Sequence, residues 1–211
     1  MSYREVWDGE YRGRGRLWAG HTREIPELPA GSSVLELGCG DGKSAASMPD
    51  LWRVTALDIS REAILLCRDA APEASPVLGD ACHLPFRSSS FDAVFSFHVM
   101  GHLPLPGRRA AASEASRVLR DGGCLFFREF GIEDMRAGRG VEVEPGTFLR
   151  GSGIITHYFN EREVLELFCD LDPLDIRTRC WRMRVKGRYL MRSEVQAAFR
   201  RRGQETGTGL G

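Results

Sequence analysis

The sequence contains no long hydrophobic segment and no closely spaced pair of cysteines. No stretch approaches the roughly 20 apolar residues that a transmembrane helix requires, so we expect no membrane span. The N-terminal residues 1–7 contain no apolar leader core, and we therefore expect a cytoplasmic protein. The six cysteines are scattered and most lie in apolar segments, which indicates reduced, buried thiols and argues against a metal site.

The chain also has no net charge, because 29 basic residues balance 29 acidic residues. The charges are nevertheless segregated: residues 176–202 contain ten arginine or lysine residues and a single acid, Glu194. Such a basic end is typical of a protein that binds a phosphate-bearing partner. A solvated, arginine-rich hairpin at the edge of a sheet would have the same composition, and the sequence leaves both interpretations open.

The length of 211 residues suits one α/β domain with a full core. Apolar and amphipathic runs predict strands at 34–37, 52–58, 76–78, 91–97 and 124–129, helices after Ser60, over 108–119 and after Asn160, and two last strands between 174 and 202 that join near Lys186. In the helix after Ser60, we expect Ile64, Leu65 and Cys67 to face inward. Strand and helix are predicted to alternate five times. This order is typical of a single-domain, Rossmann-like doubly wound sheet, mostly parallel with an antiparallel C-terminal edge strand.

The segment 34–42 carries the most specific signal in the chain. An apolar strand delivers the carboxylate of Glu36 and then a glycine-rich turn, and Asp58 ends the next strand. A βαβ unit whose second strand ends in an acid can hold a ribose, because a carboxylate accepts hydrogen bonds from both hydroxyls. Lys43 stands where the dinucleotide-binding pattern Gly-x-Gly-x-x-Gly has its third glycine. The glycine-rich turn, which has few side chains, therefore suits an amino-acid group better than a pyrophosphate. An NAD(P)-binding domain is the alternative interpretation of this segment.

This order of residues resembles motif I of the class I S-adenosylmethionine-dependent methyltransferases. The resemblance implies S-adenosylmethionine as the cofactor, with Gly38 and Gly40 letting the backbone approach its methionine part. It further implies that Asp58 accepts from the ribose hydroxyls and that Ile59 packs on the adenine. Glu36 would either support the turn or reach the methionine ammonium through water.

The following strands extend the resemblance to the adenine end of the cofactor. Asp80 would accept a hydrogen bond from the adenine amino group, and the Ala81 N–H would donate to a ring nitrogen. Phe95 and Phe97 alternate along one strand, and we expect both to point toward the ligand. Together these residues predict an S-adenosylmethionine-dependent methyltransferase.

A second resemblance covers both ends of the catalytic domain. Four motifs are similar to the corresponding segments of the tRNA 3-methylcytidine methyltransferases; they lie at 127–131, 134–135, 148–153 and 158–159. The N-terminal lead-in before the first strand is also similar to that of this family, at Trp7, Tyr11, Arg14, Trp18 and 25–28. In that family the lead-in Trp and Tyr help to cover the cofactor, so the resemblance implies cofactor contacts for Trp7 and Tyr11. The chain differs from the family at 129–130, at Ser152 and at 154–155, where it has Glu-Phe, Ser and Ile-Ile.

The segments outside the predicted sheet suggest how the chain is organised. We expect residues 1–30 to cover the cofactor and substrate, 31–202 to form the methyltransferase domain, and 131–160 to be an insertion on the substrate side. Residues 203–211 are predicted to be a disordered tail.

The predicted reaction needs few catalytic groups. Placing the nucleophile about 3 Å from the methyl group, in line with the departing sulfur, supplies most of the acceleration. Glu129 or Asp134 could stabilise a cation formed on a base nitrogen. His102 occupies the position of a histidine in that family and is the third catalytic candidate, with orientation of the turn after the fourth strand as its expected role. The alternative for Glu129 is an ion pair with Arg128 that closes its strand.

The sequence leaves the methyl acceptor open. The tRNA resemblance implies a base nitrogen in tRNA, with the basic end and the region of Arg150 holding phosphates. A protein side chain or a small metabolite is the alternative acceptor, with residues 1–30 and 131–160 as a lid. A catalytically silent, cofactor-binding partner subunit is the third hypothesis, and the oligomeric state is not predicted.

Overall fold

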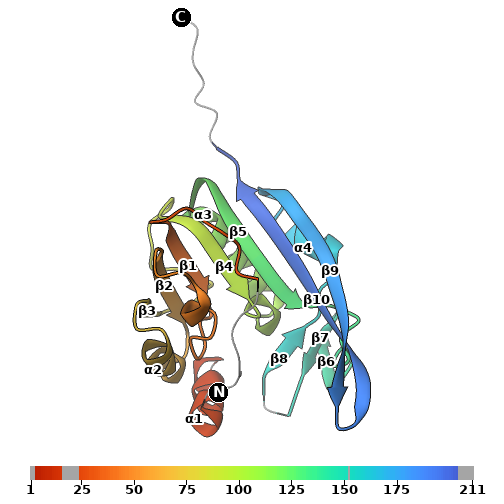
Figure 1. Ribbon diagram of the computed structural model, residues 1–211. Coiled ribbons are helices and arrows are strands. Elements are labelled where there is room, and N and C mark those ends of the chain that lie inside the picture. Colours follow the sequence, from red (N-terminus) through yellow and green to blue (C-terminus); the bar gives the residue numbers. More distant parts are fainter. Residues whose placement is uncertain (1–2, 16–23, 152, 204–211) are drawn as a thin grey trace, which may run out of the picture.

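A computed structural model describes residues 3–15, 24–151 and 153–203 as an α/β protein (Figure 1). Trp18, Ser152 and residues 204–211, on which several predictions fall, lie outside the described residues. The elements in chain order are α1 (Tyr3–Arg14), β1 (Ser33–Leu37), η1 (Ala45–Ser47), β2 (Arg53–Asp58), α2 (Arg61–Ala70), β3 (Ser75–Leu78), β4 (Phe91–Phe97), η2 (Met100–His102), α3 (Leu105–Val118), β5 (Leu119–Phe130), β6 (Val141–Glu144), β7 (Thr147–Leu149), β8 (Ile155–His157), α4 (Glu161–Leu167), β9 (Leu171–Val185) and β10 (Arg188–Arg201).

The main sheet has seven strands in the order β3-β2-β1-β4-β5-β10-β9. The first five strands of this order are parallel, and β10 is antiparallel to both β5 and β9. The order in which successive strands are added to the sheet reverses between β1 and β4, and an open α/β sheet binds its ligand at such a point, at the carboxyl ends of the strands. The predicted fold class is confirmed, including the antiparallel C-terminal edge.

Two apolar layers sandwich the sheet because successive side chains of a strand point to opposite faces. Leu35, Leu37 and Val94 pack with α3 and α4 in one cluster. Val34 and Phe95 pack on the other face with α2 and the segment around Leu28. Both faces of the central strands are thus covered, as parallel strands require.

The predicted helix starts are confirmed at two caps. The Ser60 hydroxyl accepts the Ala63 N–H at 3.2 Å at the start of α2. Asn160 and Glu163 form a reciprocal capping box at the start of α4. Leu65, predicted to face inward, is instead 38% exposed, because its neighbours Ala63 and Cys67 occupy the buried stripe of α2.

The predicted fivefold alternation of strand and helix is wrong in two connections. Between β1 and β2 the described chain forms only the single 3₁₀ turn η1. Pro49 follows closely and disfavours helical backbone at Met48, which leaves no room for a longer helix. The described residues between β3 and β4 form no helix either, since this segment lacks an amphipathic pattern.

The segment 131–160 contains a second, three-stranded sheet in the order β6-β7-β8. Figure 1 shows this sheet beside the far end of β9 and β10. In the described part of the chain, no helix has the length and apolar character needed to cross a membrane.

Candidate active site

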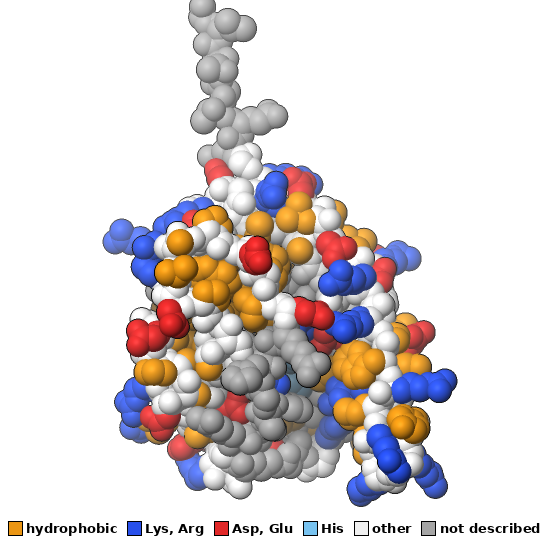
Figure 2. All heavy atoms as spheres, in the orientation of Figure 1, with side chains coloured by type: hydrophobic (Ala, Val, Ile, Leu, Met, Phe, Trp, Pro, Cys, Tyr) orange, Lys and Arg blue, Asp and Glu red, His pale blue; other side chains and the backbone are white. Residues whose placement is uncertain are grey.

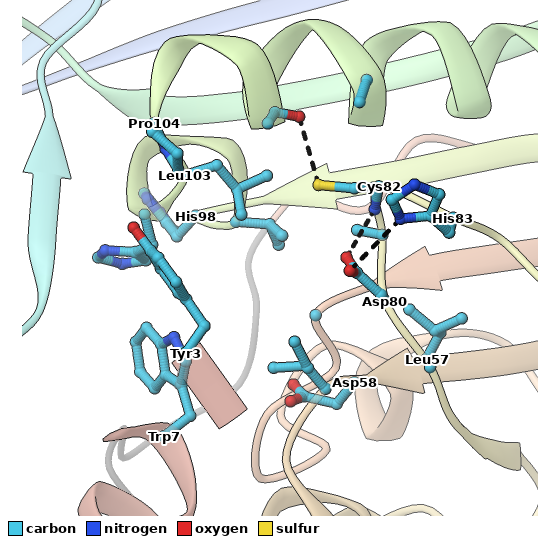
Figure 3. Close-up of a pocket in the computed structure, with 18 of the residues that line it drawn as sticks. Tyr3, Trp7, Leu57, Asp58, Asp80, Cys82, His83, His98, Leu103 and Pro104 are labelled. Carbon is cyan, nitrogen blue, oxygen red and sulfur yellow. Dashed lines mark hydrogen bonds and ion pairs between the residues drawn. The ribbon is translucent and has the colours of Figure 1, made fainter. Parts of the chain in front are cut away.

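A cavity of about 470 Å³ lies where β1, β2, β3 and β4 end. This volume is in the range of pockets that hold small ligands or cofactors. Figure 3 shows Asp58 and Asp80 on one side of the cavity and Tyr3 and Trp7 across from them, with His98 and Leu103 above. Strand ends thus form one wall, and helix α1 forms a cover over it.

Asp58 connects the end of β2 to the glycine-rich turn. Its carboxylate accepts the Gly40 N–H at 2.9 Å and the Ser60 N–H at 2.8 Å. The residue is buried, and burial raises the pKa of Asp58 to about 6. Asp58 and Ile59 both line the cavity, as the ribose and adenine roles require.

Asp80 and Ala81 follow β3 and line the same cavity. The Asp80 carboxylate accepts the Cys82 N–H at 2.8 Å and lies 3.6 Å from His83 Nδ1. The predicted adenine-binding pair is therefore beside Asp58, and the Asp80 turn is held by its own side chain.

Helix α1 was not predicted as a helix, yet it carries the predicted cover residues. Trp7 and Tyr11 both line the cavity, and their ring centroids lie 6.0 Å apart. Asp8 fastens the helix, because it accepts the Ser60 hydroxyl at 2.6 Å at the start of α2. The cover is thus joined to the same turn that Asp58 organises.

The two glycines of the turn differ in position. Gly38 lines the cavity directly and has a φ of 63°, a conformation that favours glycine. Gly40 lies under the Tyr11 hydroxyl, with a φ of 55°. Glu36 does not line the cavity: it is buried below the turn and accepts hydrogen bonds from Ser44 and the Ala45 N–H. Of the two roles considered for Glu36, this geometry fits support of the turn.

Phe95 and Phe97 do not line the cavity, contrary to the expectation from the sequence. Phe95 is fully buried, and both rings pack in the cluster on the α2 face of the sheet. Their ring centroids lie 5.4 Å apart. Alternate side chains of β4 share this face, and that face is filled by the core rather than open to the ligand.

His98 is a cavity residue that the sequence analysis missed. It directly follows β4 and has a φ of 58°, which is uncommon for a residue with a side chain. Its Nε2 lies 3.2 Å from the Glu194 carboxylate, and its ring stacks on Phe130 with centroids 4.3 Å apart. Its place at the end of a strand next to β1 is the signal that could have found it.

His102 lines the cavity and joins it to the small sheet. Its Nδ1 lies 2.8 Å from the Ile155 carbonyl oxygen, so Nδ1 carries the proton. Burial lowers the pKa of His102 to about 4, and Trp7 meets the ring edge-on with centroids 5.0 Å apart. These contacts fit the structural role that the sequence indicated.

Glu129 is fully buried and lies behind the turn after β4 rather than in the cavity. It accepts the Gly101 N–H at 2.9 Å, and burial raises the pKa of Glu129 to about 7. Arg128 does not pair with it, because adjacent strand residues point to opposite faces. Arg128 instead lies 3.5 Å from the Glu194 carboxylate on β10.

Asp134 is also outside the cavity. Its buried carboxylate pairs with Arg136 at 2.8 Å and with Arg192 at 2.6 Å, and these arginines lower the pKa of Asp134. The pairs tie the start of the 131–160 segment to β10. This arrangement supports an anchoring role for Asp134.

Comparison with known proteins agrees with this geometry. Residues 35–127, from β1 into β5, match the family described as "Methyltransferase domain". A SAM-dependent methyltransferase from Methanosarcina mazei superposes with a TM-score of 0.67 and 27% identity, covering 83% of this chain and 95% of the other. Residues 35–127 therefore match a methyltransferase domain, and the fold is that of an S-adenosylmethionine-dependent methyltransferase, which agrees with S-adenosylmethionine as the predicted cofactor.

Two curated relatives carry names that describe action on tRNA. The chain is 34% identical to the tRNA (carboxymethyluridine(34)-5-O)-methyltransferase ALKBH8 of Mus musculus over 72% of this chain and 22% of that protein. It is 27% identical to the tRNA N(3)-methylcytidine methyltransferase Mettl2 of Drosophila melanogaster over 84% of this chain and 63% of that protein. The matched regions thus span less than two thirds of both relatives.

Proposed function

We propose that the protein transfers a methyl group from S-adenosylmethionine to a nucleotide of tRNA. The carrying observation is the contact between His98 at the cavity wall and Glu194 on β10. This contact brings β10, one strand of the basic pair β9–β10, next to the cavity. The two tRNA methyltransferases among the relatives support the same class of acceptor.

The residues around the cavity fit the cofactor in order along the strand ends. Asp58 would hold the ribose, and Asp80 with the Ala81 N–H would hold the adenine. Gly38 has no side chain, which leaves room for the methionine part of the cofactor. Trp7 and Tyr11 would cover the cofactor and exclude water from it.

Methyl transfer requires little from the protein beyond the correct placement of the cofactor and the acceptor. The bound cofactor supplies an electrophilic methyl group on a sulfonium. The protein's task is to orient the acceptor in line with that methyl group and to keep water out. A base nitrogen such as cytosine N3 has a lone pair available at neutral pH, so this acceptor requires no strong general base.

A labelled methyl-donor assay against separated tRNA, protein and small-molecule fractions tests the proposal. We expect label in tRNA, and we expect loss of that label after RNase treatment. Asp58→Asn serves as the cofactor-site control and should lower incorporation into every fraction. Label confined to the protein or small-molecule fraction would reject tRNA as the acceptor.

A small hydrophobic metabolite is the second candidate acceptor. The observation that favours it is the apolar part of the cavity lining that Leu103, Pro104 and Pro106 form. In that case incorporation would survive RNase treatment and would appear in the small-molecule fraction.

A further inference from the structure

The hairpin formed by β9 and β10 extends well past its neighbour β5. Strand β5 ends at Phe130, which pairs with Glu194, whereas β10 continues to pair with β9 as far as Arg188 and Val185. Figure 1 shows this part of the hairpin projecting beyond the main sheet at the lower right. We call residues 179–193 the hairpin arm.

The hairpin arm combines positive charge with exposed aromatic rings. It contains six arginine or lysine residues and no acid. Trp181 is 37% exposed on one face of the hairpin, and Tyr189 is 68% exposed on the other. In Figure 2 blue side chains surround orange ones in this region at the lower right. Charge alone would protect an edge strand from aggregation, but exposed aromatic rings work against that purpose and need another explanation.

One face of the arm leads to the cavity through stacked groups. The Arg192 guanidinium lies 5.6 Å from the Trp181 ring centroid and 5.2 Å from the Phe130 centroid. Phe130 in turn stacks on His98, which lines the cavity. A continuous series of aromatic and cationic groups therefore runs from the projecting arm to the cavity wall.

A donor without a partner lies beside this series. Arg136 stacks on the second face of Phe130, with its guanidinium 3.8 Å from the ring centroid. Its Nη2 is buried and has no hydrogen-bond partner among the described residues. Together with Arg192, Arg136 holds the Phe130 ring in its place between the arm and the cavity.

We propose that the hairpin arm binds the unpaired nucleotides of an RNA loop, with Trp181 as the stacking platform and the exposed arginines of the arm as phosphate contacts. Bases stack on aromatic side chains irrespective of sequence, while flanking arginines follow the backbone phosphates. An acidic protein would satisfy the arginines but would leave Trp181 and Tyr189 without a matching planar surface. The inference rests on the proposed function and specifies how that substrate would be held.

Fluorescence anisotropy tests whether the arm binds unpaired nucleotides, with a labelled RNA stem-loop and a blunt RNA duplex of equal length as the two probes. The wild-type protein should prefer the stem-loop. Trp181→Ala should weaken stem-loop binding about tenfold and leave duplex binding unchanged, and Trp181→Phe should retain it. Leu174→Ala is the matched control, because Leu174 is 48% exposed on the same strand outside the arm.

Charge is tested separately. Arg182→Glu with Arg184→Glu should weaken binding to both RNAs and reduce its salt dependence. Arg68→Glu with Arg87→Glu, at exposed positions away from the arm, should change neither. Adenosylhomocysteine affinity should be the same in all these variants.

Two outcomes would overturn the proposed RNA binding by the arm, and one would reject only the proposed methylation of tRNA. An unchanged stem-loop preference in Trp181→Ala overturns the inference, as does equally tight binding of a polyglutamate peptide. If the arm variants lose stem-loop preference but the wild-type protein methylates no tRNA, the RNA-binding role of the arm is supported and tRNA is rejected as the methyl acceptor.

Discussion

The Tyr11 hydroxyl lies 2.7 Å from the point where a Cβ on Gly40 would sit. The cover helix α1 and the glycine-rich turn are therefore in direct contact, without space for a side chain between them. Burial raises the pKa of Tyr11 well above its usual value, and the nearby Asp58 carboxylate raises it further, so the phenol stays neutral.

Gly40→Ala is expected to weaken adenosylhomocysteine binding at least tenfold. The new methyl group would displace Tyr11, and overpacking of this kind costs about 1–3 kcal/mol. Gly122→Ala is the matched control, since Gly122 also has a positive φ of 76° but nothing within 4 Å of its added Cβ. Calorimetric titration should show lost affinity in the first variant and not in the second, and equal affinities would contradict the contact.

Asp58→Asn is expected to lower adenosylhomocysteine affinity about 10- to 100-fold, because hydrogen bonds to a charged acceptor contribute about 1.5–3 kcal/mol. Burial raises the pKa of Asp58 to about 6. Below that pH the carboxyl is protonated and accepts less well, so wild-type affinity should fall as the pH decreases through 6. Titrations from pH 5 to 8 should show this dependence in the wild type and a flat profile in the variant.

Glu129→Gln is expected to flatten the pH dependence of stability. Burial raises the pKa of Glu129 from 4.5 to about 7. The folded protein therefore retains this proton where the unfolded chain releases it, and stability falls as the pH rises from 4.5 through 7. The change amounts to about 3 kcal/mol for this pKa difference.

Urea unfolding at pH 5 and pH 8 measures the effect. Burial also raises the pKa of Glu36 and of Asp58, so these groups contribute in the same direction and the comparison is the difference between wild type and Glu129→Gln. Identical losses of stability in the two proteins between these pH values would show that Glu129 is not the titrating group.

Asp134→Asn is expected to destabilise the fold by about 3–5 kcal/mol, because it leaves buried arginine charge without a counterion. Asp92→Asn, which breaks the partly exposed pair with Arg120, should cost about 1 kcal/mol or less. Thermal and urea unfolding distinguish these values. If Asp134→Asn abolished methyl transfer at unchanged stability, a catalytic role would replace the anchoring role.

Much of the site nearest the glycine-rich turn was predictable from the sequence. Asp58, Asp80 and Gly38 each stand at or just after a strand end, and a parallel sheet brings such ends to one edge. The capping signals at Ser60 and Asn160 were equally local, since each acts within three residues of its own position.

The remaining features depend on contacts between distant segments. Whether Phe95 faces the ligand or the core depends on what covers each face of the sheet, which the alternation along one strand does not reveal. His98 meets Glu194 because β10 returns beside β5, and Arg128 pairs with that same acid instead of its chain neighbour.

Local chemistry thus specified the strands, the bare turn and the acids that end the strands, because hydrogen-bonding capacity and backbone freedom belong to each residue. The folded chain alone assigned partners to the buried charges and stacked rings from Trp181 to His98. Those partners are set by strand order and register, which arise when the whole sheet assembles.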